Sequence, residues 1–333
     1  MTFPLNRPLR ILLSASARQA LAPAVAEVLG THPHELVTVD EAPATGVDAA
    51  FISRDVTGLS TKHVLTDDTR AFYDTLRRSS ELQWLHIHSA GADRPIYTEL
   101  RARGVQVSTS SGANAEVVAQ TALAGVLALA RRFPQLMAAQ QAHTWAPLIG
   151  QTPPRDLAGQ TAVIVGWGPI GQRIGAVLRL LGLKLIVVRR HAARGVEEGV
   201  EMVDFAAFQH VLPRADWLLL ACPLTEQTRA LVNRQALAAL PHGANLINVA
   251  RGEVVVEREL IEALREGRLG GAYLDVFEHE PLAADSPLWA LPGVIVTPHS
   301  AGHSDGNERR VAEIFLANLT RWQSGQSLQH CIA

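Results

Sequence analysis

The chain has few cysteines, no long apolar run and almost no net charge, and each absence excludes a class of protein. Only two of its 333 residues are cysteines, Cys222 and Cys331, so there is no disulfide framework, and a reducing cytoplasm is the expected location. No apolar run approaches the roughly 20 residues that span a bilayer. The formal charge of −2 lacks the basic excess typical of nucleic-acid-binding proteins. We therefore expect neither a membrane nor a nucleic acid as partner.

The N-terminal segment RPLRILLSASA contains an apolar centre that is too short for a signal peptide, and we interpret it as a buried strand.

Strand-like and helix-like segments alternate along most of the chain. Its composition, 47% hydrophobic and 19% charged, is that of an ordinary globular protein, and its length suits about two domains. The alternation predicts an α/β fold with doubly wound parallel sheets. The segment 115–133 is apolar nearly all round, which is typical of a buried or interface helix.

Three glycines lie between an apolar run, TAVIV, and a helix-like segment. In a dinucleotide site the first glycine permits a tight turn, the second lets the backbone approach a pyrophosphate, and the third lets the helix pack closely. The helix N-terminus then faces the anion. We predict that the cofactor contacts this loop through Gly166, Gly168, Pro169, Ile170 and Gly171.

A second apolar strand, LIVV, ends at Val188 and is followed by Arg189 and Arg190. An NAD site usually has Asp or Glu there, about 20 residues after the glycines, whereas Arg accommodates the 2′-phosphate of NADP. The pair therefore favours NADP over NAD, although a solvated strand end is an alternative interpretation.

The glycine loop lies in mid-chain, so a dinucleotide fold around it leaves both ends of the chain outside. We expect a discontinuous substrate domain of residues 1–112 and 301–333, and an NADP-binding domain of residues 113–300.

Reactive side chains follow three later apolar runs. Ligands of open α/β sheets lie beyond the carboxyl ends of the strands, so these groups can converge. Reduction of a 2-oxo acid needs a proton donor, and His299 suits that role, with Glu280 favouring its charged form. Arg251 can hold the substrate carboxylate with two hydrogen bonds. A nicotinamide would supply the hydride.

From about residue 84 onward the chain resembles the D-isomer-specific 2-hydroxyacid dehydrogenases. The resemblance rests on HSAGAD, GWGPIG, CPLTEQTRALVN, LINVARGEVVVERELIEALREGRLGGAYLDVFEHEPL and VTPHSAG in this order. It implies two Rossmann-like domains around an active-site cleft, and a catalytic Arg, Glu and His at Arg251, Glu280 and His299.

The same resemblance implies further contacts. The backbone amides of Ala90 and Gly91 would hold the substrate carboxylate, and Asp275 would bind near the nicotinamide carboxamide. The loops at Pro223, Val249 and Ala250 would contact the cofactor. The helix from about residue 115 would form a homodimer interface.

Several residues keep more than one interpretation. Glu278 competes with Glu280 for the histidine. Arg54 could meet a substrate carboxylate or pair with Asp55. The indole of Trp167 could cover the adenosine side or face solvent, and Ser300 could touch substrate. His299 and His303 have the spacing of a helical metal pair, but we expect no metal site.

The sequence thus predicts NADPH-dependent reduction of small 2-oxo acids, glyoxylate and hydroxypyruvate, to D-2-hydroxy acids. The alternatives are an NAD-linked, D-lactate-like dehydrogenase and a nicotinamide-sensing, corepressor-like binding protein.

Overall fold

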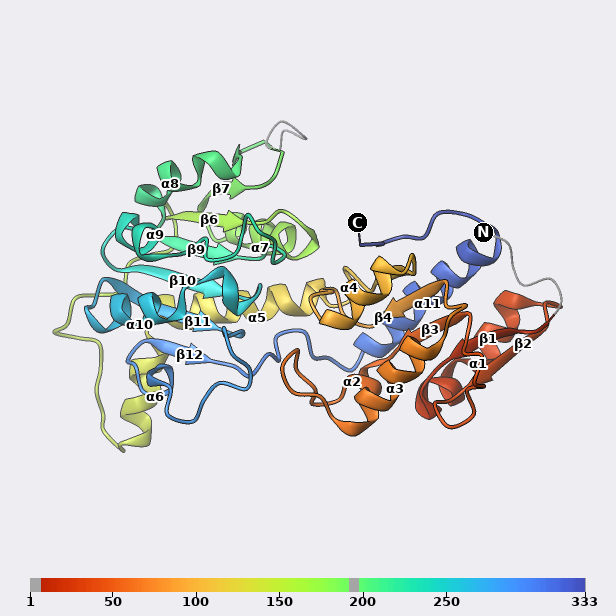
Figure 1. Ribbon diagram of the computed structural model, residues 1–333. Helices are drawn as coiled ribbons and strands as arrows, with labels where there is room; N and C mark the ends of the chain where they lie inside the picture. Colours follow the sequence, from red (N-terminus) through yellow and green to blue (C-terminus); the bar gives the residue numbers. More distant parts are fainter. Residues whose placement is uncertain (1–6, 192–197, 333) are drawn as a thin grey trace. The chain divides into compact units, whose positions relative to one another are not determined.

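The computed structural model describes residues 7–191 and 198–332, and the chain divides into two compact units (Figure 1). Unit 1 contains residues 1–114 and 304–333, and unit 2 contains residues 115–303. Each unit is built on a sheet whose named strands all pair in parallel. The predicted α/β class with doubly wound parallel sheets is confirmed.

Unit 1 has a five-stranded sheet in the order β2-β1-β3-β4-β5. Ser14 caps the first helix by accepting from the N–H of Ala17, and Pro95 occupies the first turn of α4, where its missing N–H costs nothing. The elements of this unit are β1 (Leu9–Leu12), α1 (Ala15–Leu29), β2 (His34–Val37), β3 (Ala49–Ile52), α2 (Arg54–Thr57), α3 (Asp67–Arg78), β4 (Trp84–Ile87), α4 (Pro95–Ala102), β5 (Gln106–Thr109) and α11 (Asn307–Gln323).

Helices cover both faces of the unit 1 sheet. Val25 of α1 and Phe315 of α11 are fully buried against one face, and Leu76 of α3 and Leu100 of α4 against the other. The C-terminal segment returns to the sheet edge, where the N–H of Ile332 donates to the Val107 carbonyl at 3.0 Å. The last helix is thereby part of the same unit as the first strands.

Unit 2 has a seven-stranded sheet in the order β12-β11-β10-β9-β6-β7-β8. The strand order reverses between β6 and β9, which is the switch point where open α/β sheets bind ligands. The elements are α5 (Ala115–Ala130), α6 (Phe133–Gln141), β6 (Thr161–Val165), α7 (Pro169–Leu180), β7 (Lys184–Val188), β8 (Val200–Val203), α8 (Phe208–Val211), β9 (Trp217–Leu220), α9 (Arg234–Ala239), β10 (Ala244–Asn248), α10 (Glu257–Arg265), β11 (Leu269–Leu274) and β12 (Val294–Val296), with short 3-10 turns η1 (Phe205–Ala207), η2 (Leu212–Arg214), η3 (Gly252–Val254) and η4 (Pro287–Trp289).

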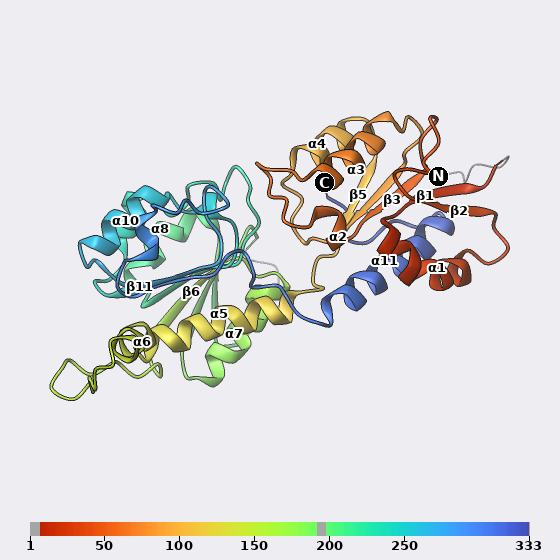
Figure 2. The same cartoon turned by 90° about the horizontal axis from the view of Figure 1, so that it is seen from below.

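The strands of unit 2 read as continuous apolar runs because the sheet is buried on both faces. Figure 2 shows α5 and α7 along one face and α8 and α10 along the other. Gly125 lets α5 lie close to the sheet, since a Cβ there would be 2.5 Å from the ring of Tyr273. The carboxyl ends of β6, β9, β10 and β11 are thus held on one rigid layer, and the predicted reactive residues of this unit follow these strands and β12.

Candidate functional site

The glycine loop joins β6 to α7 and contains two unusually close backbone approaches. Gly166 has a φ of 99°, and a Cβ there would lie 2.7 Å from the Ala221 carbonyl oxygen. A Cβ at Gly171 would lie 2.1 Å from the carbonyl oxygen of Gly166. Gly168 differs, because a Cβ added there would have no other atom within 4 Å. It is the N-cap of α7 and offers no side chain to the helix. The loop therefore leaves open space over a helix N-terminus, which fits the pyrophosphate of a dinucleotide.

Trp167 was expected to cover the adenosine side or to face solvent. A Cβ on Gly175 would lie 2.4 Å from the Trp167 ring, and Leu185 lies against the same position. The indole therefore packs against α7 and is partly buried, and its contact with the adenosine side of a cofactor stays a prediction. Pro169 begins α7 and is exposed, and Ile170 follows it half-buried.

The two arginines stand where β7 ends. The N–H of Arg189 donates to the Val203 carbonyl at 3.0 Å, which fixes its backbone beside β8. Arg190 follows and is exposed. The N–H of Gly166 donates to the Val188 carbonyl at 2.9 Å, so the glycine loop and the arginines start from the same edge of the sheet. Both arginines thus follow the strand that is bonded to the glycine loop, and their contact with a 2′-phosphate stays a prediction.

His299 and Glu280 form a direct pair on unit 2. His299 Nδ1 lies 2.8 Å from Glu280 Oε2, and Glu280 Oε1 accepts from the Phe277 N–H at 3.2 Å. Burial alone would raise the pKa of Glu280, but its hydrogen bond to His299 and the charges of His299 and Arg251 lower this pKa below its usual value. The histidine side chain is 50% exposed and its partner only 18%. The carboxylate is thus held in place, while the other imidazole nitrogen, Nε2, remains available to a substrate.

Asp275 organises the loop that carries His299. Its carboxylate accepts from the Thr297 hydroxyl at 2.7 Å and from the N–H groups of Ser300 and Ala301 at 2.8 and 3.1 Å. Its carbonyl accepts from the His299 N–H at 2.8 Å. Burial raises the pKa of Asp275, and these donors oppose that rise. The four contacts hold His299 in a left-handed conformation, φ 51°, that non-glycine residues seldom adopt.

Arg251 lies in a loop shaped by a buried amide that the sequence analysis did not single out. Asn248 is 1% exposed; its Nδ2 donates to the Arg251 carbonyl and its Oδ1 accepts from the Ala250 N–H, both at 3.1 Å. The next residue, Gly252, lies in close contact with the backbone of Phe277: a Cβ at Gly252 would be 1.8 Å from the Phe277 carbonyl carbon. The loop that carries Arg251 therefore rests directly on the turn that carries Glu280.

Glu278 does not approach the histidine. Its Oε1 accepts from the N–H of Glu257 at 3.0 Å, and its own N–H donates to Glu257 Oε2 at 3.2 Å. Of the two competing glutamates, the structure therefore brings Glu280 to His299 and directs Glu278 to the start of α10. The Glu280–Pro281 peptide bond, which follows the second glutamate, is cis.

The remaining cofactor contacts expected on unit 2 also follow strands. Pro223 lies exposed beyond β9, where its carbonyl accepts from the Thr228 hydroxyl at 2.7 Å. Val249 and Ala250 lie buried just beyond β10. Ser300 donates its hydroxyl to the Pro298 carbonyl at 3.0 Å. These positions share the sheet edge with the glycine loop, and their contacts with a cofactor or substrate stay predictions.

The predicted residues of unit 1 also lie beyond strands. Ala90 and Gly91 follow β4, and the Ser89 hydroxyl donates to the Gly91 carbonyl at 2.7 Å. Arg54 begins the short helix α2 and is exposed, while the Asp55 carboxylate accepts from the Ser53 hydroxyl at 2.6 Å. Whether Arg54 meets a substrate or pairs with Asp55 stays a prediction.

His299 and His303 do not form a helical pair, because residues 299–303 lie outside any helix, in bend, turn and loop conformations. Within residues 7–191 and 198–332 no group of three or more His, Cys, Asp or Glu side chains is placed to hold a metal ion. In the same ranges no helix is both long and apolar enough to cross a bilayer.

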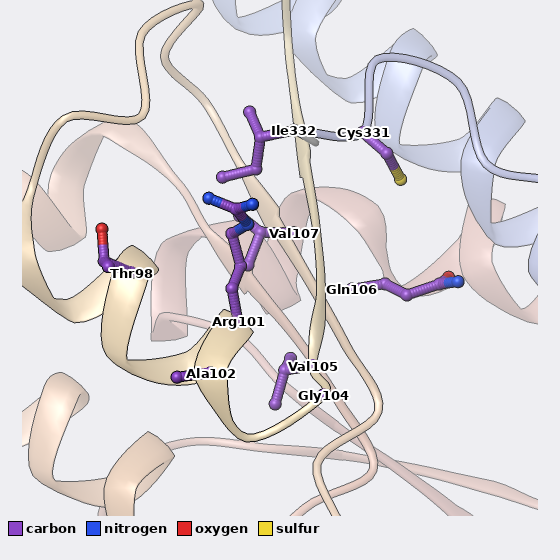
Figure 3. Close-up of a pocket in the computed structure, with 9 residues that line it drawn as sticks. All are labelled: Thr98, Arg101, Ala102, Gly104, Val105, Gln106, Val107, Cys331 and Ile332. Atoms are coloured by element: carbon purple, nitrogen blue, oxygen red, sulfur yellow. The ribbon is translucent and has the colours of Figure 1, made fainter. Parts of the chain in front are cut away.

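Unit 1 contains a hollow of about 500 Å³ between α4, β5 and the C-terminal segment (Figure 3). None of the predicted site residues lines it; its walls are Thr98, Arg101, Ala102, Gly104, Val105, Gln106, Val107, Cys331 and Ile332. We assign it no role in the candidate site.

Comparison with known proteins adds independent findings. Residues 123–301 match the family model described as D-isomer specific 2-hydroxyacid dehydrogenase, NAD binding domain. A glyoxylate reductase of Korarchaeum cryptofilum is 30% identical over 269 residues, which cover 79% of each protein. Glyoxylate/hydroxypyruvate reductase A of Arabidopsis thaliana is 33% identical over 240 residues, covering 72% of this chain and 75% of that protein. A crystal structure of a D-isomer specific 2-hydroxyacid dehydrogenase from Xanthobacter autotrophicus Py2, in complex with NADPH and MES, superposes with a TM-score of 0.77 at 28% identity over 98% of each chain.

The contact at Gly252 yields a stability prediction. We expect Gly252→Ala to lower the free energy of unfolding by about 3 kcal/mol or more, because the new methyl group would overlap the backbone of Phe277. Gly168→Ala is the matched control. Its φ of −79° and open surroundings accept a methyl group, and Ala is only a poorer N-cap than Gly, so the change should stay within about 1 kcal/mol. Urea unfolding followed by circular dichroism measures both, and equal effects would contradict the contact.

Proposed function

Because this chain belongs to the D-isomer specific 2-hydroxyacid dehydrogenase family and is therefore an NAD(P)-dependent oxidoreductase, we propose that it reduces glyoxylate and hydroxypyruvate to D-2-hydroxy acids with NADPH. The observation that carries the proposal is the 2.8 Å contact between His299 and Glu280, with the charge of Arg251 acting on the same carboxylate. The glyoxylate reductases among the relatives support the choice of small 2-oxo acids.

In the proposed reaction the chain holds the substrate and supplies one proton. Arg251 binds the substrate carboxylate and polarises the neighbouring carbonyl. The backbone amides of Ala90 and Gly91 in unit 1 keep their assignment, from the family resemblance, as contacts of a substrate carboxylate. A nicotinamide held by unit 2 would supply the hydride for the carbonyl carbon. His299, with Nδ1 facing Glu280, donates its Nε2 proton to the carbonyl oxygen and becomes neutral. Glu280 orients the ring and stabilises its charged form before transfer.

The cofactor half of the proposal rests on unit 2. We assign the pyrophosphate to the α7 N-terminus, at the glycine loop that includes Pro169 and Ile170. The 2′-phosphate is assigned to Arg189 and Arg190. The loops at Pro223, Val249 and Ala250 would contact the nucleotide, and Asp275 would lie near the carboxamide. The crystal structure from Xanthobacter contains NADPH, which supports the choice of cofactor. On this proposal unit 2 is the NADP-binding domain and unit 1 the substrate domain.

We also propose that the chain forms a homodimer through α5 and its surroundings. The buried face of α5 packs on the sheet, but Leu127 on the same helix is 42% exposed, and Phe133 and Met137 of α6 are 52% and 54% exposed. Trp145 and Leu180, at 95% and 86%, also belong to unit 2. Exposed apolar groups of this size are typical of protein interfaces, and a second copy would cover them.

The activity and the cofactor choice are tested together. Purified protein should oxidise NADPH in the presence of glyoxylate or hydroxypyruvate, with kcat/KM at least about tenfold above that for NADH, because two arginines face the 2′-phosphate. Arg189→Asp should abolish the preference, whereas Arg265→Asp, which changes the charge equally on α10, should preserve it. The assay is the loss of NADPH absorbance over a panel of 2-oxo acids of graded size. No turnover across the panel would refute the reductase, and faster turnover with NADH would support the NAD-linked alternative.

The lowered pKa of Glu280 predicts a pH dependence. The hydrogen bond to His299 and the charges of His299 and Arg251 favour the ionised carboxylate, so Glu280 keeps holding the imidazole until the pH drops below the usual range of a glutamate. The wild-type kcat should therefore show its acid fall-off below that range. Glu280→Gln has no carboxylate to protonate, so we expect this acid fall-off to be absent and kcat at neutral pH to be lower.

The control for this experiment is His299→Ala, which should lose about a hundredfold in kcat at every pH while still binding NADPH in a fluorescence titration. An unchanged fall-off in Glu280→Gln, or normal turnover in His299→Ala, would contradict the assignment.

The dimer is tested by sedimentation velocity at micromolar protein. Leu127→Glu combined with Phe133→Glu should convert the dimer to monomer, because two charges would be buried without partners. Leu59→Glu, which replaces a 93% exposed leucine of unit 1, should leave the dimer intact. A wild-type protein that is monomeric throughout the concentration range would refute the proposal.

A further inference from the structure

Glu278 and Glu257 form a reciprocal contact next to the catalytic pair. Each carboxylate accepts from the other residue's backbone N–H, at 3.0 Å for Glu278 and 3.2 Å for Glu257. The N-cap of α10, Val256, offers no side-chain hydrogen bond, so the Glu278 carboxylate supplies an acceptor at the first turn of this helix. The chain segment between β11 and Pro281 is thereby tied to α10.

The same peptide unit is pressed against the Arg251 loop. A Cβ at Gly252 would lie 1.8 Å from the carbonyl carbon of Phe277 and 2.3 Å from the nitrogen of Glu278. The Phe277 N–H in turn donates to Glu280 Oε1 at 3.2 Å. The turn that presents Glu280 is therefore fixed on one side by Gly252 and on the other by Glu257.

We propose that Glu278, through its reciprocal contact with Glu257, is a positioning residue that holds the Glu280 carboxylate against His299. This inference rests on the proposed function. Glu278 itself touches no reacting group, since its carboxylate points to α10. Its effect passes through the short turn 277–280, in which a displacement of Glu278 moves the Phe277 N–H that Glu280 accepts from.

The two carboxylates lie in partly buried surroundings, close enough for the charge of Glu278 to act on Glu257. Burial raises the pKa of Glu257, the N–H of Glu278 opposes the rise, and the charge of Glu278 adds to it. A mere helix cap needs only one acceptor, whereas this arrangement brings two like charges together. The repulsion is offset by the two backbone donors and by the helix N-terminus. The arrangement is consistent with a turn whose position is fixed from both sides.

If Glu278 positions Glu280, its substitution should lower kcat and leave KM nearly unchanged. A misplacement of about 1 Å can cost up to a hundredfold in rate, and we expect Glu278→Ala to lower kcat about tenfold. KM for the 2-oxo acid should change less than about twofold, because Asn248 holds the Arg251 loop independently. Glu278→Gln should restore at least about half of kcat, because its amide oxygen still accepts from the Glu257 N–H and its NH₂ can donate to the Glu257 carboxylate.

The matched control is Glu259→Ala. Glu259 lies in the same first turn of α10 and accepts from a backbone N–H, but that N–H belongs to Arg234 and not to the catalytic turn. Its loss should lower the melting temperature and leave kcat unchanged. In the background of Glu280→Gln, Glu278→Ala should have no further effect on kcat, since both act on the same carboxylate.

Hydrogen–deuterium exchange provides a readout that does not need turnover. In Glu278→Ala, peptides covering 276–281 should exchange faster, while those covering the glycine loop 166–171 should match the wild type. Unchanged exchange in 276–281, an equal rise across unit 2, or full kcat in an otherwise active enzyme would overturn the inference. A wild type without any turnover would refute the proposed function alone, and the exchange result would still decide whether Glu278 holds the turn.

Discussion

Asp275 is 3% exposed, and the loop that carries His299 depends on its hydrogen bonds. Its carboxylate accepts from Thr297, Ser300 and Ala301, and its carbonyl accepts from His299, so one residue at the end of β11 fixes the conformation of five consecutive residues, 297–301. A buried carboxylate is stable only when its oxygens are hydrogen-bonded, and here the donors come from the loop that must be ordered. The cost of burying the charge and the strain at His299 are thus offset by the same contacts.

The loop that carries Arg251 is also held by contacts of residues at the end of a strand. Asn248 at the end of β10 shapes the Arg251 loop, and Gly252 lets that loop lie against the turn at Phe277. Each element is anchored at the end of a parallel strand whose pairing leaves little freedom. Preorganisation of this kind lowers the reorganisation needed when a substrate binds, because the polar groups already point to their working positions.

How much of the site could be predicted from the sequence differed from residue to residue. The apolar runs of unit 2 and the glycines predicted the α/β class and the loop between β6 and α7, because strand burial and backbone permissiveness are local properties. Glu280 and Glu278 are two positions apart in one turn, and only the family resemblance favoured Glu280. Trp167 packs on α7 because Gly175, in the second turn of that helix, leaves room for the ring. Asn248 carried no signal beyond its place at a strand end.

The sequence by itself determined the fold class, the membership of a dehydrogenase family and the set of reactive side chains, since these depend on periodicity and on motifs with fixed spacing. Only the tertiary structure decided which of these groups meet. His299 and Glu280 are 19 residues apart in the chain, and Glu257 and Glu278 are 21 apart. Their contacts exist because parallel strands bring the loops after β10, β11 and β12 to one edge of a sheet, and that register is a property of the assembled sheet and not of any local segment.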